Sequence, residues 1–187
     1  MRNDRRSRIG LATAFLLGMF MAAWVLVCET RAQSPSPDDG TPSEEAAAPW
    51  MKIAKGEIGQ AEKAGEAENN PRIMEYLATT GKFKSDETPW CSAFANWVMV
   101  EAGEKGTDSA LARSWLKWGE AIEEPRYGCL VVFKRGKSTW QGHVGFYVRT
   151  EGDKIVVLGG NQSNTVSIAP RTKADLLGYR WLGSKGK

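Results

Sequence analysis

Residues 86–94 read Asp-Glu-Thr-Pro-Trp-Cys-Ser-Ala-Phe, and they mark the start of a strongly apolar segment. Pro89 disfavours helical backbone at Thr88, so a helix is expected to begin near Trp90 or Cys91. Apolar residues continue to Ala102, and Gly103 ends the segment. A helix over 91–102 places Cys91 at its N-terminus, where the helix dipole favours the nucleophilic thiolate. The alternative is a buried structural cysteine, the commoner role of a free cysteine.

Short helices are predicted before this segment and strands after it. Apolar spacing indicates a helix over 50–58, and proline at a first-turn position indicates another over 71–80. Asp108-Ser109 can cap a further helix to Trp118. Strands are predicted over 129–134, 143–150, 154–158, 165–168 and 178–182. Helices followed by an antiparallel meander predict an α+β domain, with N-terminal helices packed on a small antiparallel β-sheet.

The N-terminal third has a different composition. Four arginines within residues 1–8 precede an apolar run over 9–28, so residues 1–32 are predicted to be a signal peptide or an N-terminal membrane anchor. In both cases the arginines stay inside, and the rest is exported to the periplasm or the cell exterior. Residues 33–48 are rich in proline, serine and acids and predict a disordered linker. The folded domain is expected over 49–183.

Charge and composition exclude several classes of function. The 187-residue chain is 42% hydrophobic, enough for one ordinary domain. Its formal net charge of +3 comes from residues 1–32, and the remainder has twenty basic and twenty acidic residues. This balance argues against a nucleic-acid partner, and membrane contact is expected only through the N-terminal segment. Three cysteines and one histidine do not suit a disulfide framework or a zinc site. We expect a monomer without metal or cofactor.

His143 is the only histidine, and it begins a predicted strand between Gly142 and Val144-Gly145. A lone histidine on an apolar strand can be a buried core residue. Flanking glycines at a strand start, however, suit a side chain that is presented at a site. Histidine is the usual base for a cysteine nucleophile, so His143 is the predicted base for Cys91.

The predicted hairpin brings a third polar residue to His143. A two-residue turn at Gly152-Asp153 places His143 opposite Gln162, and a three-residue turn over 151–153 places it opposite Asn161. Directly opposed residues point to the same face of a sheet. An amide oxygen there can accept from the imidazole and fix its tautomer. We assign this role to Asn161, although an asparagine after two glycines can also simply form a turn.

These three segments together resemble the CHAP and NlpC-like superfamily of bacterial cell-wall cysteine amidases and peptidases. The resemblance rests on Thr-Pro-Trp-Cys-Ser-Ala-Phe at 88–94, His-Val-Gly-Phe-Tyr at 143–147 and Gly-Gly-Asn-Gln-Ser-Asn at 159–164, and covers about residues 50–183. It implies a papain-like α+β fold, no cofactor, and the peptide part of peptidoglycan as substrate. It also implies the catalytic set Cys91, His143 and Asn161.

The sequence departs from this family at two positions. Relatives usually carry aspartate where Cys129 stands, so we interpret Cys129 as a core or edge residue. Many carry an acid on the strand after the histidine, where this chain has Gly159.

The predicted substrate-binding residues are Trp90, Trp140 and Gln162. Trp90 and Trp140 adjoin the two catalytic candidates and could line a cleft, with core packing as the alternative. Five other tryptophans lie at apolar periodic positions and are expected in the core: Trp50, Trp97, Trp115, Trp118 and Trp181.

The predicted activity is hydrolysis of an amide bond through a Cys91 acyl-enzyme. The backbone N–H of Cys91 is expected to stabilise the oxyanion. Two alternatives stay open. One is a non-catalytic wall-binding domain of the same fold, and the other is an amidase-fold effector that acts on an amide outside the wall.

Overall fold

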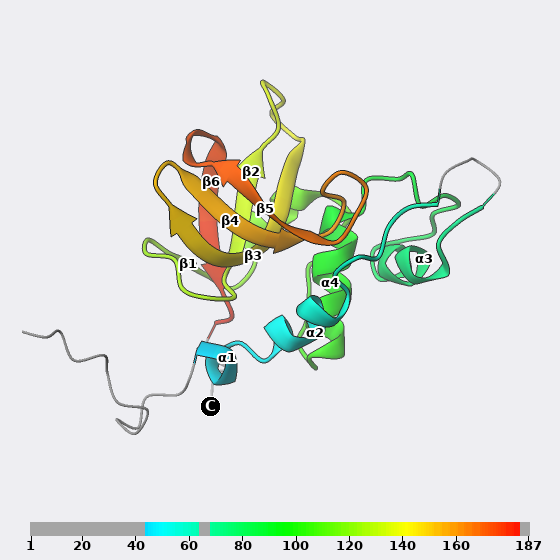
Figure 1. Ribbon diagram of the computed structural model, residues 1–187, viewed down its shortest axis with the longest axis horizontal. Helices are drawn as coiled ribbons and strands as arrows, with labels where there is room; N and C mark the ends of the chain where they lie inside the picture. Colours follow the sequence, from blue (N-terminus) through cyan, green and yellow to red (C-terminus); the bar gives the residue numbers. More distant parts are fainter. Residues whose placement is uncertain (1–43, 64–67, 184–187) are drawn as a thin grey trace, which may run out of the picture. The chain divides into compact units, whose positions relative to one another are not determined.

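The computed structural model describes residues 44–63 and 68–183, in which short helices precede a single sheet (Figure 1). The predicted signal or anchor over 1–32 lies outside the described residues. The helical elements are α1 (Glu44–Ala47), α2 (Trp50–Gly56), α3 (Pro71–Ala78), α4 (Cys91–Glu101), and the 3₁₀ turns η1 (Ala112–Lys117) and η2 (Lys173–Asp175). None of the described helices is long and apolar enough to cross a membrane.

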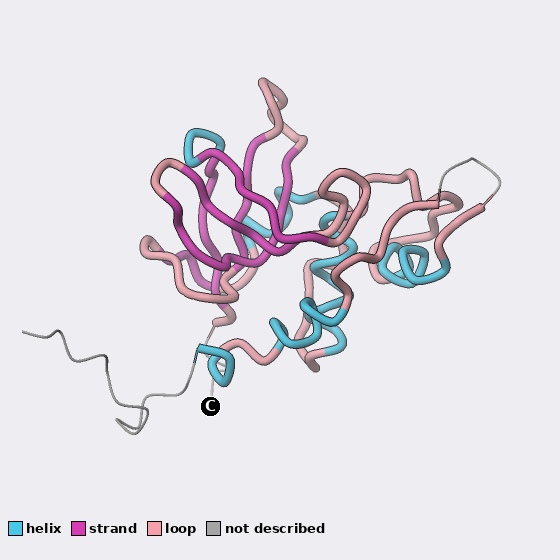
Figure 2. The backbone as a smooth tube through the Cα atoms, in the orientation of Figure 1, coloured by secondary structure: helices cyan, strands magenta, loops and turns pink. Residues whose placement is uncertain are grey.

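The sheet contains six antiparallel strands in the order β1-β6-β2-β3-β4-β5. These are β1 (Glu120–Ile122), β2 (Leu130–Lys134), β3 (Gly142–Glu151), β4 (Lys154–Gly159), β5 (Ser167–Thr172) and β6 (Leu176–Trp181). Strands β2 to β5 form the expected meander, and β6 returns to pair with β2. The predicted α+β fold is confirmed, and Figure 2 shows the separation of helices from strands.

Helix α4 is the central helix of the domain and packs against β3, α2 and α3. All residues from Cys91 to Met99 are buried, including the polar Ser92 and Asn96. A helix that is apolar on every side belongs in a core. Its buried polar groups are satisfied, because Ser92 Oγ donates to the Ser109 carbonyl at 2.6 Å and Asn96 Nδ2 donates to the Ser92 carbonyl at 2.9 Å. The apolar pattern of α4 therefore reflects its burial in the core of the domain.

The predicted helix from Asp108 to Trp118 is wrong in its first half. Asp108 has a positive φ of 52°, which a helix cap does not adopt. Its backbone N–H and that of Thr107 donate to Asn96 Oδ1 at 2.9 and 2.7 Å. These hydrogen bonds to α4 keep the segment in a loop conformation. Of the predicted helix, only the 3₁₀ turn η1 is formed.

The C-terminal end of the predicted linker is ordered. Residues Glu44–Ala47 form α1, and the Ala48 side chain is fully buried. A Cβ placed on Gly128 would lie 2.5 Å from Ala48 Cβ, so the two backbones meet closely. Alanine favours helix and carries little side-chain entropy, which suits the short helix α1, but only Ala48 among the described side chains of this stretch joins the core.

The hairpin between β3 and β4 combines both predicted registers. Glu151 pairs with Lys154 across a two-residue turn, in which Gly152 has the positive φ that such turns require. A bulge at Val148 then shifts the register, so that Tyr147 pairs with Val157 and Phe146 with Leu158. Strand β4 ends at Gly159, before the ladder reaches His143. Strand pairing therefore does not decide which residue lies beside the imidazole.

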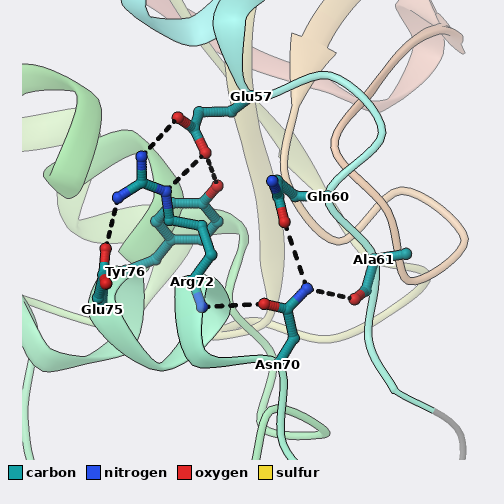
Figure 3. A network of polar contacts seen from close by, with 7 residues as sticks. All are labelled: Glu57, Gln60, Ala61, Asn70, Arg72, Glu75 and Tyr76. Atoms are coloured by element: carbon teal, nitrogen blue, oxygen red, sulfur yellow. Dashed lines mark hydrogen bonds and ion pairs between the residues drawn. The ribbon is translucent and has the colours of Figure 1, made fainter.

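The buried carboxylate of Glu57 connects the end of α2 to α3 (Figure 3). Glu57 is 8% exposed and accepts from Arg72 Nε at 3.0 Å, Arg72 Nη2 at 3.1 Å and the Tyr76 hydroxyl at 2.5 Å. Burial, followed by this hydrogen bond to Glu57, raises the pKa of Tyr76. The Tyr76 ring packs on Trp90 and Phe94, at centroid distances of 5.9 and 5.3 Å. The network therefore supports the residues on both sides of Cys91.

Replacing Glu57 with glutamine is expected to lower the free energy of unfolding by about 1–3 kcal/mol, because a buried charged acceptor is lost while Arg72 remains. Arg72 is partly exposed, which keeps the effect below that of a fully buried pair. Glu75→Gln is the matched control, since Glu75 pairs with the same arginine but is 56% exposed. Urea denaturation measures both variants, and an equal loss in the two would contradict this view of the network.

Candidate active site

Two adjoining hollows open on either side of the N-terminus of α4. The larger has a volume of about 540 Å³ and is lined by both Cys91 and His143. The smaller, of about 260 Å³, shares Pro89, Cys91, Arg135 and Gly142 with it. Together they form a cleft that passes over the cysteine. The structure thus brings the predicted nucleophile and the predicted base into one site.

Cys91 is the first residue of α4, as the proline pattern predicted. Its thiol is buried, and burial raises its pKa. Backbone hydrogen bonding from Val144, the residue after His143, and the positive charge of Arg171 both lower this pKa but do not outweigh burial. The helix N-terminus was expected to favour the thiolate, but desolvation of the thiol exceeds this effect. A base must remove the proton during the reaction.

The segment before Cys91 is fixed by a second buried carboxylate. Asp86 is 1% exposed, and its Oδ2 accepts from the backbone N–H groups of Lys63 and Asn70 at 3.1 and 2.8 Å. The Asp86 N–H in turn donates to Asn69 Oδ1 at 2.9 Å. These bonds tie residues 86–90 to the N-terminus of α3, and they position the nucleophile without help from a side-chain cap on α4.

His143 lies near the start of β3 and is buried. Burial lowers its pKa to about 3, and the charges of Arg171 and Arg135 act in the same direction. The imidazole is therefore neutral at pH 7 and able to accept a proton. A Cβ on the preceding Gly142 would lie 2.7 Å from the Phe133 carbonyl, so glycine lets the strand begin this close to β2.

Gln162 is the polar side chain that acts on the imidazole. Its amide raises the pKa of His143, in opposition to burial, but no hydrogen bond of normal geometry joins the two side chains, and His143 Nε2 has no partner. A Cβ on Gly159 would lie 3.3 Å from His143 Nε2 and 3.5 Å from Gln162 Cδ. Gly159, the position at which many relatives carry an acid, thus adjoins His143 Nε2. The Gln162 amide lies next to the same position. The Gln162 amide is fixed by a hydrogen bond, in which its Nε2 donates to the Ser167 carbonyl at 2.6 Å.

Asn161 takes a different place from the one predicted. It has a φ of 54°, so the chain turns at this residue. With its amide oriented to suit its neighbours, Oδ1 accepts from the Trp90 backbone N–H at 3.1 Å and from the Trp90 indole at 3.2 Å. Asn161 lines the larger hollow but connects the loop after β4 to the start of α4. These contacts favour Gln162 over Asn161 beside the base.

The two tryptophans predicted to line the cleft differ. Trp90 is fully buried and its indole donates to Glu62 Oε1 at 2.7 Å, so its predicted contact with substrate is wrong. A Cβ on Gly160 would lie 2.5 Å from the Trp90 ring, which shows how closely the loop covers it. Trp140 is 63% exposed and lines the smaller hollow. Of the five tryptophans expected in the core, Trp50, Trp97 and Trp115 are buried, and Trp118 and Trp181 pack against it.

The basic residues of the cleft were not predicted. Arg171 lies in β5 and Arg135 follows β2, and both line the larger hollow. The only indication of them in the sequence was that a basic residue, Arg171, follows the Gly-Gly-Asn-Gln segment within a short distance. Cys129, by contrast, lies where expected, in an apolar cluster with Val131 and Phe133. Burial raises its pKa to about 12. Among residues 44–63 and 68–183, no cluster of acidic, histidine or cysteine side chains could hold a metal ion.

Residues 83–161 match the CHAP domain family. The match agrees with the resemblance to the CHAP and NlpC-like superfamily stated above, over the part of the domain that carries the candidate site residues. The matched segment includes Cys91, His143 and Asn161 and ends one residue before Gln162.

Among solved structures, the chain is similar to a protein described as similar to lipoprotein, of the NLP/P60 family, from Staphylococcus aureus subsp. aureus Mu50. The identity is 19% and the TM-score 0.43, over 80% of this chain and 46% of that one. This chain therefore spans less than half the length of that structure. No curated protein matches the chain.

Proposed function

We propose that the protein hydrolyses an amide bond in the peptide part of peptidoglycan, with Cys91 as nucleophile and His143 as base. The observation that carries the proposal is that Cys91 and His143 line one cleft. A buried thiol beside a neutral imidazole is the arrangement expected for general-base activation of cysteine. The CHAP match supports the cell wall as the source of the substrate.

The reaction begins when His143 accepts the Cys91 proton and the sulfur attacks the amide carbonyl. The backbone N–H of Cys91 lies in the first turn of α4, where helical N–H groups have no intrahelical partner, and it stabilises the oxyanion. His143 then donates its proton to the leaving amine, and a thioester remains. Water, deprotonated by His143, attacks the thioester and releases the acid and the free thiol.

We further propose that the domain acts outside the cytoplasmic membrane as a monomer. Export rests on the basic and apolar segment over residues 1–32, whether it is cleaved or retained as an anchor. A non-catalytic wall-binding domain would not need a cysteine and a histidine in one cleft. An effector acting on a non-wall amide would use the same residues, so substrate tests must separate it.

Digestion of purified sacculi tests the proposal. The full-length protein is incubated with sacculi, and mass spectrometry identifies the new termini. A new amine and a new carboxyl at one peptide bond are expected, together with complete dependence on Cys91. Release of reducing sugar ends without new amines would show a different reaction. An inert wall combined with hydrolysis of a non-wall amide would favour the effector.

Gln162→Ala is expected to lower kcat about tenfold or more, because the imidazole loses the amide that lies near its Nε2, and a misoriented base costs much in rate. Asn161→Ala is expected to have a smaller effect on kcat, since its amide contacts Trp90. Gln162→Glu is a useful second variant, because it restores the type of residue that relatives carry beside the histidine. A larger loss for Asn161→Ala than for Gln162→Ala, at equal stability, would return the positioning role to Asn161.

A further inference from the structure

The two hollows of the cleft differ in charge. The larger one is lined by three basic side chains, from β2, from the residue that follows it and from β5: Lys134, Arg135 and Arg171. The smaller one shares Arg135 at its junction with the larger but is otherwise lined by uncharged residues, among them Leu111, Ala112 and the exposed ring of Trp140. Since both hollows meet at Cys91, a substrate that fills the cleft has its charged part on one side of the scissile bond and its uncharged part on the other.

Two of the three cations have no acidic partner. Lys134 Nζ lies 3.7 Å from Asp175 Oδ1, but neither Arg135 nor Arg171 forms an ion pair with any residue in the described part of the chain. Arg171 is half-buried, and its Nε donates to Gln162 Oε1 at 3.4 Å. A guanidinium has five N–H donors, so most of this fork remains available. An arginine left in this way suits bidentate binding of a carboxylate.

The arginines approach His143 from both sides. Strand β3 lies between β2, which Arg135 follows, and β4, next to which β5 carries Arg171. Both charges lower the pKa of His143, and Arg135 also lowers that of Arg171. Asp175, which pairs with Lys134, offsets this positive charge at Arg171 only in part, because burial and Arg135 leave the pKa of Arg171 lowered. An anion bound between the arginines would relieve the remaining repulsion.

The acidic residues of the larger hollow lie on the opposite wall. Glu62 and Glu87 belong to the segments before α4, and Glu62 is already engaged by the Trp90 indole. They do not neutralise the arginines, which come from the sheet. The sheet side of the hollow is thus the place for an anionic group.

We propose that Arg171, assisted by Arg135, binds a carboxylate of the substrate, while the Trp140 hollow takes an uncharged, apolar part of it. This inference rests on the proposed function, because it names the charge of the substrate at the same site. Among amides of the cell wall, it selects a bond in an acidic peptide, with the carboxylate on the His143 side of the scissile bond.

A binding experiment separates this inference from catalysis. The full-length Cys91→Ala variant does not turn over substrate, so calorimetry can measure binding of stem peptides released from sacculi. The same peptides, with their carboxylates converted to carboxamides, serve as the uncharged probe. We expect the acidic peptides to bind at least about tenfold more tightly, with a preference that weakens as salt rises.

Adding Arg171→Gln to that variant is expected to remove most of the preference and leave the affinity for the amidated peptides almost unchanged. Arg149→Gln is the matched control: it removes one charge from β3, where the arginine is exposed and pairs with Glu151. Circular dichroism confirms that each variant is folded, and Arg171→Lys, which keeps the charge, should retain part of the preference.

Equal binding of both peptide forms, or of neither, would overturn the inference, as would a preference that survives Arg171→Gln. Sacculus digestion by the unmodified protein decides the proposed function independently. A strong preference for the acidic peptides without any cleavage would support the carboxylate site and reject the hydrolase.

Discussion

Cys91→Ser is expected to lower amide hydrolysis by about 10³-fold or more while the protein remains folded, because a serine hydroxyl is far harder to deprotonate and His143 has no stronger base to help it. Serine replaces the sulfur with a smaller atom and should disturb the packing of α4 little. Initial rates of amine release from sacculi measure the loss.

Cys129→Ser is the control for this variant. Cys129 is 1% exposed, belongs to the apolar cluster with Val131 and Phe133, and does not line the cleft. It should keep near-normal turnover, although a hydroxyl in an apolar site can cost some stability. A thiol-reactive probe should label Cys91 faster than Cys129. Full activity of Cys91→Ser, or loss of activity in Cys129→Ser alone, would refute the nucleophile assignment.

His143→Ala should remove nearly all of the amide hydrolysis, because the chain contains no other histidine that could take the Cys91 proton. We expect a loss of about 10³-fold or more in kcat, with substrate affinity changed much less. His143→Gln, which keeps much of the side-chain volume, is expected to be equally inactive. Activity above about a tenth of the original in both variants would show that the base lies elsewhere.

The pH behaviour of the single imidazole gives an independent test. Protein carrying isotope-labelled histidine has one imidazole signal in NMR, and its titration is expected near the pKa of about 3 that burial imposes, well below the usual value of 6.5. The imidazole thus stays neutral through pH 5, so no acidic limb from His143 is expected near 6.5. A titration at 6 or above would contradict the buried neutral base.

The same shift links His143 to stability. Between about pH 6.5 and 3 the unfolded chain binds a proton at this histidine and the folded protein does not, so the contribution of His143 to stability falls as the pH falls through this window. The slope is about 1.4 kcal/mol for each pH unit. Denaturation of the original protein and of His143→Gln should therefore converge at low pH, with the original losing stability faster.

The elements that carry the candidate catalytic residues could be predicted, because their formation depends on local rules. Pro89 fixed the start of α4 and so the helix N-terminus on which Cys91 lies. The apolar run after it predicted a buried helix, and the short apolar runs between 129 and 158, with a turn at Glu151-Gly152-Asp153, predicted the strands of the meander. Helix α4 and the strands of the hairpin were correct for this reason, whereas β1, with three residues, carried too little pattern to be detected.

The identity of the residue beside the base could not be predicted in the same way. Hairpin arithmetic assumes an unbroken ladder, but the bulge at Val148 and the end of β4 at Gly159 both interrupt it. Beyond Gly159 the loop conformation depends on its contact with Trp90, and positive φ values at Asn161, Ser163 and Asn164 turn successive side chains in different directions. No pattern of period two describes such a loop.

The sequence by itself determined the α+β class, the α4 start at Cys91 and the pairing of one cysteine with one histidine, since these follow from proline sterics, apolar periodicity and residue type. Only the tertiary structure decided the charge state and surroundings of the site. Burial of Cys91 and His143 depends on packing between α4 and β3, and it reverses the expected effect of the helix end on the thiol pKa. Arg135 and Arg171 meet at the cleft because β2 and β5 lie on either side of the β3-β4 hairpin, a relation between residues far apart in the chain that no local rule contains.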